Sequence, residues 1–169
     1  MSETTQYETM DNQHTNLIGL AYLAGIIDGE GCITIERNGK RRKSTGRLGL
    51  QPSITVTNTD CNLIAHCEQI FASIGAQAYI KSSIAGKRNK RCYWLVCKGQ
   101  EKVRTALKAL LPYLVAKRGQ AQLTMKFIES RTTDGHPKGK GYSDDELALM
   151  EDIQELNQRG VRDCRQASE

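Results

Sequence analysis

Two acidic residues stand between glycines in the stretch "LAGIIDGEG", residues 23–31. Asp28 and Glu30 lie two residues apart, directly after a run of small and apolar residues with helical character. The C-terminal end of a helix is electronegative, so two carboxylates there repel each other and are poorly placed for stability. A divalent cation would relieve the repulsion, and carboxylate oxygens suit Mg²⁺. On these residues alone, the alternative is that Asp28 caps backbone groups and Glu30 is an exposed turn residue.

The segment before the acids is predicted to be a helix that is apolar nearly all round, and such helices are usually buried on several sides. Its apolar residues are Leu17, Ile18, Leu20, Ala21, Leu23, Ala24, Ile26 and Ile27. Within this set Ala21, Ala24 and Gly25 form one stripe with Asp28, and small residues in a stripe let another helix approach closely. We expect Gly29 and Gly31 to end the helix.

Four segments alternate between apolar and polar residues, which predicts strands: 32–38, 47–58, 77–84 and 91–98. Ile33 and Ile35 share one face of the first segment, and Pro52 in the second fits a sheet edge or a bulge. Short connections within each pair indicate antiparallel hairpins. One sheet face is apolar and takes the helices, whereas the other is polar and basic with nothing in the sequence to cover it. We expect that bare face to be the functional surface.

Helical patterns follow each predicted hairpin. Asp60 is a suitable N-cap for a helix that Gly75 closes, a helix begins near Glu101 and is interrupted by Pro112, and 123–130 continues as a helix. The order α-β-β-α-β-β-α predicts an α+β fold. We divide the chain into a disordered leader (1–15), one domain (16–131), and a linker loop with a C-terminal amphipathic helix (132–169). Ser143 and Glu146 have the spacing of a capping box for that last helix.

Positive charge is concentrated in the middle of the chain, although the formal net charge is only +5. Residues 1–30 contain 5 acidic and no basic residues, and residues 132–169 contain 9 acidic and 5 basic ones. Residues 31–131 contain 19 Lys and Arg against 5 Asp and Glu, a net charge of +14. Because this charge follows the predicted strands, it favours a nucleic-acid partner over the alternative of a solvated charged face.

The six cysteines are at positions 32, 61, 67, 92, 97 and 164, without a CxxC pair, and the three histidines stand apart. This spacing disfavours zinc and indicates reduced, mostly buried thiols in an intracellular protein. Residues 1–16 are polar and contain no Lys or Arg, so we expect no signal or transit peptide. No apolar run approaches the roughly 18 residues that cross a membrane. We expect a bacterial or archaeal cytoplasm, or an organelle with its own genome.

The stretch "LAGIIDGEG" resembles the LAGLIDADG motif of homing endonucleases. Residues 17–131 also follow that family's order of elements, and "VTNTD" and "LLPYLVAKRGQAQLTMKFIE" resemble its later segments. The resemblance implies an antiparallel sheet that forms a saddle, with helices on one face and DNA on the other. It identifies a single-motif chain, which implies a homodimer with helices packed through Ala21, Ala24, Gly25 and Asp28.

The resemblance also assigns catalytic roles. Glu30 matches the last acid of the motif, the metal ligand, assisted by the backbone carbonyl of Gly29, and Asp28 matches the more structural first acid. Asn58 matches a polar residue that positions water or metal, with Thr59 and Asp60 as alternatives, and Lys117 matches the basic active-site residue. The chain has Gly29-Glu30 where the family name reads Ala-Asp. Glu is one methylene longer and offers the same carboxylate.

These matches imply cleavage of both strands of duplex DNA at a long, near-palindromic target, which leaves short 3′ overhangs. Mg²⁺ or Mn²⁺ would support cleavage, and Ca²⁺ would support binding without cleavage. No membrane or small-molecule substrate is implied. Two rival functions stay open: an RNA maturase or non-cleaving DNA-binding protein of the same fold, and a structural module whose basic loops serve solubility.

Polar residues of the bare sheet face are the predicted base readers, with Trp94 on the same face or, equally, buried. Basic residues in turns are predicted to bind phosphate rather than bases. The full set is Thr34, Glu36, Asn38, Lys40, Arg41, Arg42, Lys43, Arg47, Gln51, Ser53, Thr55, Thr57, Lys81, Ser83, Lys87, Arg88, Lys90, Arg91 and Trp94.

Overall fold

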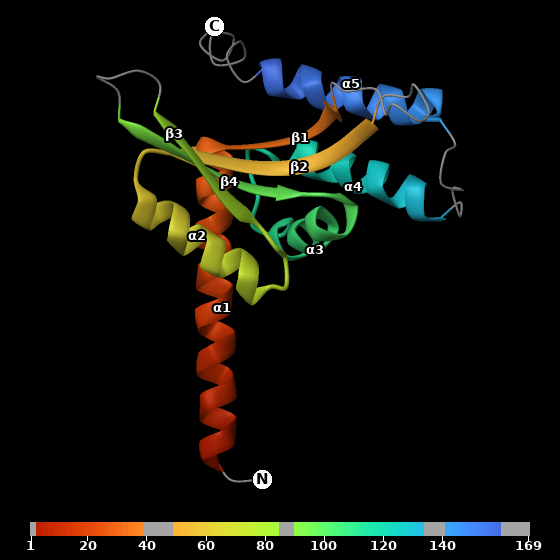
Figure 1. Ribbon diagram of the computed structural model, residues 1–169. Helices are drawn as coiled ribbons and strands as arrows, with labels where there is room; N and C mark the ends of the chain where they lie inside the picture. Colours follow the sequence, from red (N-terminus) through yellow and green to blue (C-terminus); the bar gives the residue numbers. More distant parts are fainter. Residues whose placement is uncertain (1–2, 39–48, 85–89, 134–140, 160–169) are drawn as a thin grey trace, which may run out of the picture.

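The computed structural model describes residues 3–38, 49–84, 90–133 and 141–159. The predicted order of elements is confirmed, with two helices after it (Figure 1). The elements are α1 (Glu3–Glu30), β1 (Gly31–Asn38), β2 (Gly49–Asn58), α2 (Cys61–Ser73), β3 (Tyr79–Ile84), β4 (Arg91–Lys98), α3 (Gln100–Leu110), α4 (Arg118–Thr133) and α5 (Asp144–Arg159).

The four strands form one antiparallel sheet in the order β1-β2-β4-β3. Ile54 of β2 pairs with Ile33 of β1 on one side and with Cys97 of β4 on the other, so β2 is an inner strand for most of its length. Pro52 fits the predicted edge position, because the ladder between β2 and β4 begins only at Ser53 and Pro52 is paired with β1 alone.

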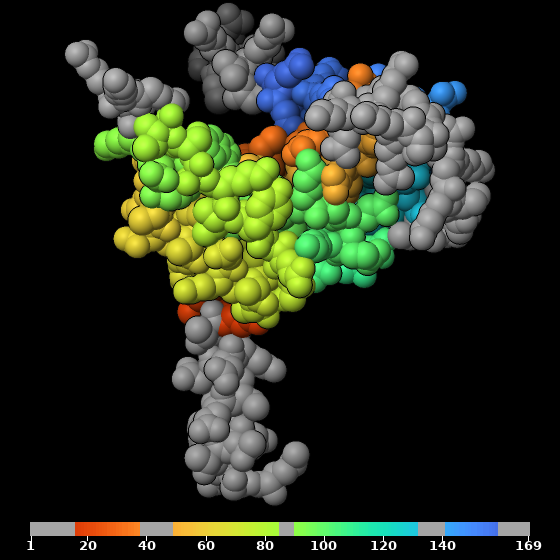
Figure 2. Space-filling model, viewed as in Figure 1, coloured from red at the N-terminus to blue at the C-terminus, as the bar shows by residue number. Residues whose placement is uncertain are grey.

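A single apolar core lies between one face of the sheet and the helices, as the alternating patterns predicted. Ile33, Ile54 and Leu95 of the sheet are buried against Leu23 and Ile27 of α1. Figure 1 shows α2 and α3 beneath the sheet, and Figure 2 shows α2 and the start of β3 in front of the C-terminal part of α1. The C-terminal part of α1 is therefore held by the core.

The junction between α1 and β1 has no loop, because α1 ends at Glu30 and β1 begins at Gly31. Gly29 and Gly31 were predicted to end the helix, and α1 does end between them, at Glu30, although neither glycine has a positive φ angle. Among the described residues, positive φ angles occur only at Gly75 and Gly99. A Cβ on Gly31 would lie 2.7 Å from both the Cα and the carbonyl oxygen of Ile27. Glycine is therefore required here by close packing rather than by φ.

The predicted disordered leader, residues 1–15, is also corrected, because α1 begins at Glu3. The sequence from Glu3 to Ile18 contains neither Gly nor Pro, so no residue interrupts the helix before the buried segment. The helix predicted over 123–130 is longer as well, since α4 begins at Arg118. Lys117 thus precedes a helix.

The predicted caps at the start of α2 and of α5 are confirmed. The Asp60 carboxylate accepts from the Asn62 N–H at 2.8 Å. In the capping box, the Glu146 N–H donates to Ser143 Oγ at 3.2 Å and the Ser143 N–H donates to Glu146 Oε2 at 3.0 Å. Glu146 is buried and also accepts from Arg131 at 3.1 Å, which ties α5 to α4.

The free edge of β1 is partly covered by α5. Asn157 Nδ2 donates to the Ile33 carbonyl at 3.1 Å, and Met150 and Ile153 of the same helix belong to the core. The C-terminal helix, for which the sequence offered no evident chemistry, therefore completes the sheet edge.

The thiols of the described part of the chain are free, with Cys67 and Cys97 buried, Cys92 half-buried, and Cys32 and Cys61 exposed. The prediction of mostly buried cysteines is thus wrong for two of them. Burial raises the pKa of Cys67 and of Cys97 to about 11. Within the described ranges, no three metal-binding side chains form a cluster, and no helix is long and apolar enough to span a bilayer.

Gly31→Ala should lower the free energy of unfolding by about 1–3 kcal/mol, because the new methyl group overlaps the backbone of Ile27 and one of the two elements must shift. Chemical denaturation would measure the change. Gly141→Ala is the matched control, since a Cβ there meets no atom within 4 Å. Equal stabilities for the two variants would contradict the packing argument.

Candidate active site

Glu30 and Asn58 come together at the point where α1 ends and β2 ends. Asn58 Nδ2 donates to Glu30 Oε2 at 2.5 Å. Asn58 Oδ1 in turn accepts from the Asp60 N–H at 2.8 Å, and Asp60 caps α2. Of the three residues considered for this position, Asn58 contacts the acid, Asp60 serves the helix, and Thr59 is exposed. The amide of Asn58 is therefore oriented on one side and presented to Glu30 on the other.

Asp28 has a separate role, because both of its carboxylate oxygens are used within the chain. They accept from the backbone N–H of Val115 at 2.7 Å and from that of Lys117 at 2.9 Å. Lys117 Nζ donates to the Asp28 carbonyl at 2.5 Å, at the electronegative end of α1. The first acid thus holds the turn before α4, and this turn places the lysine at the C-terminal end of α1, on the carbonyl two residues before Glu30.

Glu30 fits a divalent cation as one ligand of an incomplete set. Its carboxylate is exposed, and only one of its oxygens has a hydrogen-bond donor among the described residues. The neighbouring Gly29 carbonyl ends a helix, where carbonyls lack intrahelical partners. Mg²⁺ is commonly bound by one or two carboxylates, with water and substrate phosphates as the remaining ligands. One chain therefore supplies a fraction of a site, and the residues present fit Mg²⁺ in that sense.

The stripe of small residues on α1 is different from the one predicted. Ala24 is completely buried in the core, and the carboxylate of Asp28 is bonded to the turn before α4, so neither faces outward. Ala21 and Gly25 are exposed, as is Gly29. A Cβ on Gly25 would meet nothing within 4 Å outside its own turn of helix in the part of the chain that the structure describes, so packing among those residues does not explain glycine at that position.

A family model described as LAGLIDADG endonuclease matches residues 23–128, which covers α1 from Leu23, the whole sheet and most of α4. The chain belongs to the LAGLIDADG endonuclease family. No curated protein matches.

Solved structures of homing endonucleases have the same fold at low sequence identity. The homing endonuclease I-CvuI, in complex with the I-CreI target in 2 mM Mg with the DNA not cleaved, has 21% identity and a TM-score of 0.61, over 84% of this chain and 83% of that one. I-CvuI with its own target in 2 mM Ca has 21% identity and a TM-score of 0.60, over 85% and 98%. The group I intron-encoded I-CeuI, complexed with DNA, has 16% identity and a TM-score of 0.54, over 79% and 72%.

The polar face of the LAGLIDADG sheet carries most of the predicted base readers that the structure describes. By strand alternation they lie opposite the core residues, and all but Ser53 are exposed or half-buried. They are Thr34, Glu36, Gln51, Thr55, Thr57, Lys81, Ser83 and Trp94. Trp94 is half-buried and pairs with Thr57 of β2 and Lys81 of β3. Its side chain therefore lies on the open face of the sheet.

Ser53, Glu36 and Lys98 form a cluster on this face. Ser53 is fully buried and its hydroxyl donates to Glu36 Oε1 at 2.7 Å, while Lys98 Nζ forms an ion pair with Glu36 Oε2. Ser53 is therefore beneath the surface and is corrected as a base reader. Lys98 was missed, although its alternation with Cys97 pointed to the open face. Burial alone would raise the pKa of Glu36, but the hydrogen bonds from Lys98 and Ser53 and the charges of Lys98 and Lys81 hold it below its usual value.

The predicted phosphate contacts are described only in part. Arg91 is the first residue of β4 rather than a turn residue, and it donates to Ser82 Oγ at 3.2 Å. Lys90 is exposed. The other predicted phosphate contacts lie outside the described part of the chain: Lys40, Arg41, Arg42, Lys43, Lys87 and Arg88. Two predicted base readers, Arg47 and the side chain of Asn38, also lie outside it.

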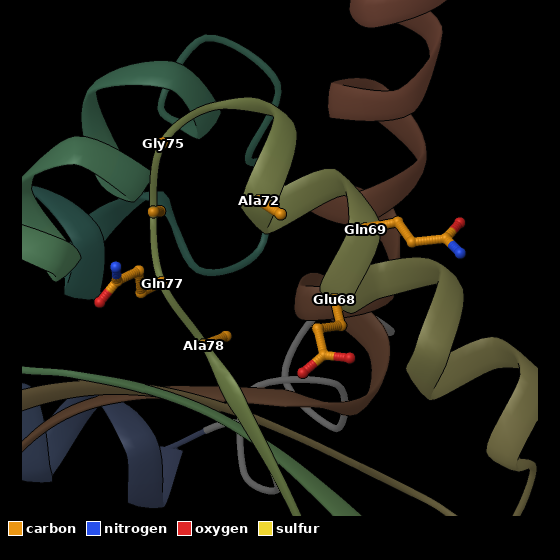
Figure 3. A pocket seen from close by; sticks show the side chains of 7 residues that line it. Glu68, Gln69, Ala72, Gly75, Gln77 and Ala78 are labelled. Carbon is orange, nitrogen blue, oxygen red and sulfur yellow. The ribbon is translucent and has the colours of Figure 1, made fainter.

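A hollow of about 490 Å³ lies between α2 and the residues before β3, lined by Glu68, Gln69, Ala72, Gly75, Ala76, Gln77 and Ala78 (Figure 3). The side chains of Gln69 and Gln77 point in different directions, and Glu68 is the only charged group among the lining residues. It contains none of the residues predicted to act in cleavage.

Asp28→Asn should lower the free energy of unfolding by about 2 kcal/mol, because the amide loses a charged acceptor for one of the two backbone N–H groups. Denaturant unfolding would measure this. Asp60→Asn is the control, since Asn is as good an N-cap as Asp and should cost only a few tenths of a kcal/mol, as a rough estimate. If both variants unfolded at the same denaturant concentration, Asp28 would not be the residue that holds the turn.

Proposed function

We propose that two copies of this chain form a homodimer that hydrolyses both strands of duplex DNA at a long, near-palindromic site. The observation that supports this most directly is the placement of Glu30, Asn58 and Lys117 around the C-terminal end of the motif helix. A free carboxylate, an oriented amide and a lysine are the groups that phosphodiester hydrolysis needs. Short 3′ overhangs and Mg²⁺ or Mn²⁺ dependence belong to the same proposal.

Each of the three residues would act on a different part of the reaction. Glu30 and the Gly29 carbonyl would hold a divalent cation, which supplies charge neutralisation and lowers the pKa of bound water. Asn58 keeps the Glu30 carboxylate in place through one hydrogen bond. The remaining acceptor positions of that carboxylate would be available to water. Lys117, fixed by the Asp28 carbonyl, would stabilise the negative charge that develops on the phosphate.

The exposed side of α1 supports self-association. Its outward residues Leu17, Ile18 and Tyr22 are 49%, 63% and 42% exposed, beside the small Ala21 and Gly25. Val115, 82% exposed, donates its N–H to Asp28 and so extends this apolar surface to the end of the helix. A contiguous apolar surface with small residues is typical of a helix contact. A two-fold contact there would bring two Glu30 residues near each other and would match a near-palindromic DNA.

Glu30→Gln should bind DNA like the parent protein and lower the cleavage rate by at least about a hundredfold, because the neutral amide is a poor cation ligand. Incubation with a randomised duplex library and Mg²⁺, followed by sequencing of cut and bound DNA, would measure both properties. Ca²⁺ in place of Mg²⁺ should give bound, uncut DNA with the parent.

The control is Glu68→Gln, which removes a carboxylate of α2 outside the site and should cut like the parent. Cleavage by Glu30→Gln at the parental rate would remove Glu30 from the mechanism. Binding without cleavage by the parent would favour the non-cleaving rival, tighter binding of structured RNA would favour the maturase, and no binding to nucleic acid would favour the structural module.

Gly25→Leu should raise the dimer dissociation constant by at least about tenfold, because overpacking a close helix contact costs about 1–3 kcal/mol. Analytical ultracentrifugation would measure the constant. Ala148→Leu, at an exposed position of α5, should associate like the parent. A Gly25→Leu protein that dimerises as tightly as the parent would place the contact elsewhere.

A further inference from the structure

Two opposite charges are fixed side by side on the open face of the sheet. Glu36 comes from β1 and Lys98 from β4, and Ser53 of β2 lies between the two strands. Among the described residues, each carboxylate oxygen of Glu36 has one donor, Ser53 Oγ for Oε1 and Lys98 Nζ for Oε2. The two side chains are 38% and 22% exposed, so both charged groups keep a side that faces outward.

Stability does not explain this ion pair. A partly exposed salt bridge contributes little to folding, and here it crosses an intervening strand and covers a polar side chain. A lone carboxylate on a surface that approaches DNA would repel phosphate. Lys98 removes this repulsion, and the hydrogen bond from Ser53 fixes the rotamer of the carboxylate. The arrangement is thus a rigid acceptor beside a rigid donor.

The contacts of Glu36 and Lys98 show how many further hydrogen bonds each charged group can make. An ionised carboxylate accepts about four hydrogen bonds, two of which Glu36 has already, and an ammonium has three donors, of which Lys98 uses one on Glu36. In the major groove, cytosine presents the N4 amino group as a donor, and its guanine partner presents O6 and N7 as neighbouring acceptors. An A·T pair offers no two neighbouring acceptors on its purine and carries the thymine methyl group.

We propose that the Glu36–Lys98 pair reads one base pair of each half-site as C·G, with the Glu36 carboxylate accepting from cytosine N4 and Lys98 donating to guanine O6 and N7. This assignment deepens the proposed function and rests on it. Ser53 is a positioning residue, since it acts through Glu36. The reader is therefore a unit of two side chains, one of which, Lys98, was not among the predicted base readers.

The test uses the full chain in Ca²⁺, so that binding is measured without turnover. The parent first selects a site from a randomised duplex library. Every single base-pair change, made symmetrically in both half-sites, is then ranked by bound fraction for the parent, Glu36→Gln, Lys98→Met and Glu101→Gln. The last variant makes the same chemical change in an ion pair of α3, which is on the helix side of the sheet. Thermal melting of each variant monitors folding.

The parent should prefer C·G at one position of each half-site. Glu36→Gln should reduce that preference about tenfold and raise binding of adenine there, because Gln pairs with the adenine edge. Lys98→Met should act at the same position, and Glu101→Gln should leave every preference unchanged. Folded Glu36→Gln protein that loses affinity equally for all sequences, or acts at an A·T position, would overturn the assignment. A parent that selects no duplex at all would overturn the proposed function instead.

Discussion

At Gly31 the motif helix passes directly into the first strand, so close to Ile27 that a side chain on Gly31 would overlap the backbone of the helix. The position of Glu30 depends on this contact. Because no loop separates α1 from β1, the carboxylate is held between a helix buried in the core and a strand paired with β2. Any added volume at Gly31 must move one of these two elements. Glu30 would then move relative to Asn58, its hydrogen-bond partner at the C-terminal end of β2.

The two acids of the motif, Asp28 and Glu30, have different roles because their surroundings differ. Asp28 is satisfied by two backbone N–H groups and positions the turn that carries Lys117. Glu30 is exposed, and within the described ranges its one hydrogen-bond partner is the amide of Asn58. The repulsion expected between two carboxylates at a helix end is therefore relieved in part inside the chain, by the turn and its lysine. One acid is left free, which is what a ligand of a shared cation requires.

Charges on the open sheet face are also arranged in two ways. Lys81 extends from the edge strand β3 over the ring of Tyr79, 5.2 Å from its centre, and is exposed. Glu36 lies on β1, the opposite edge strand, and Lys98 lies on the interior strand β4. Their charges neutralise each other. Unpaired basic groups favour any polyanion, whereas a neutral, oriented pair adds no net attraction and can only discriminate by hydrogen bonding. In the proposed function, the sheet would separate affinity from selectivity by which residues it pairs.

The sequence by itself determined the order of elements, the apolar face of the sheet, the caps at Asp60 and Ser143, and the residues Glu30 and Asn58. Each of these follows from local periodicity, from a short capping pattern, or from a family motif that spans neighbouring residues. Tertiary structure alone decided that Ala24 faces the core while Gly25 faces outward, since an apolar helix has no polar side from which its orientation can be read. It also decided the partners of Asp28, Glu36 and Ser53, because those contacts join residues from separate strands and turns. Strand alternation states which face a side chain lies on, but the register of three strands determines which charges meet there.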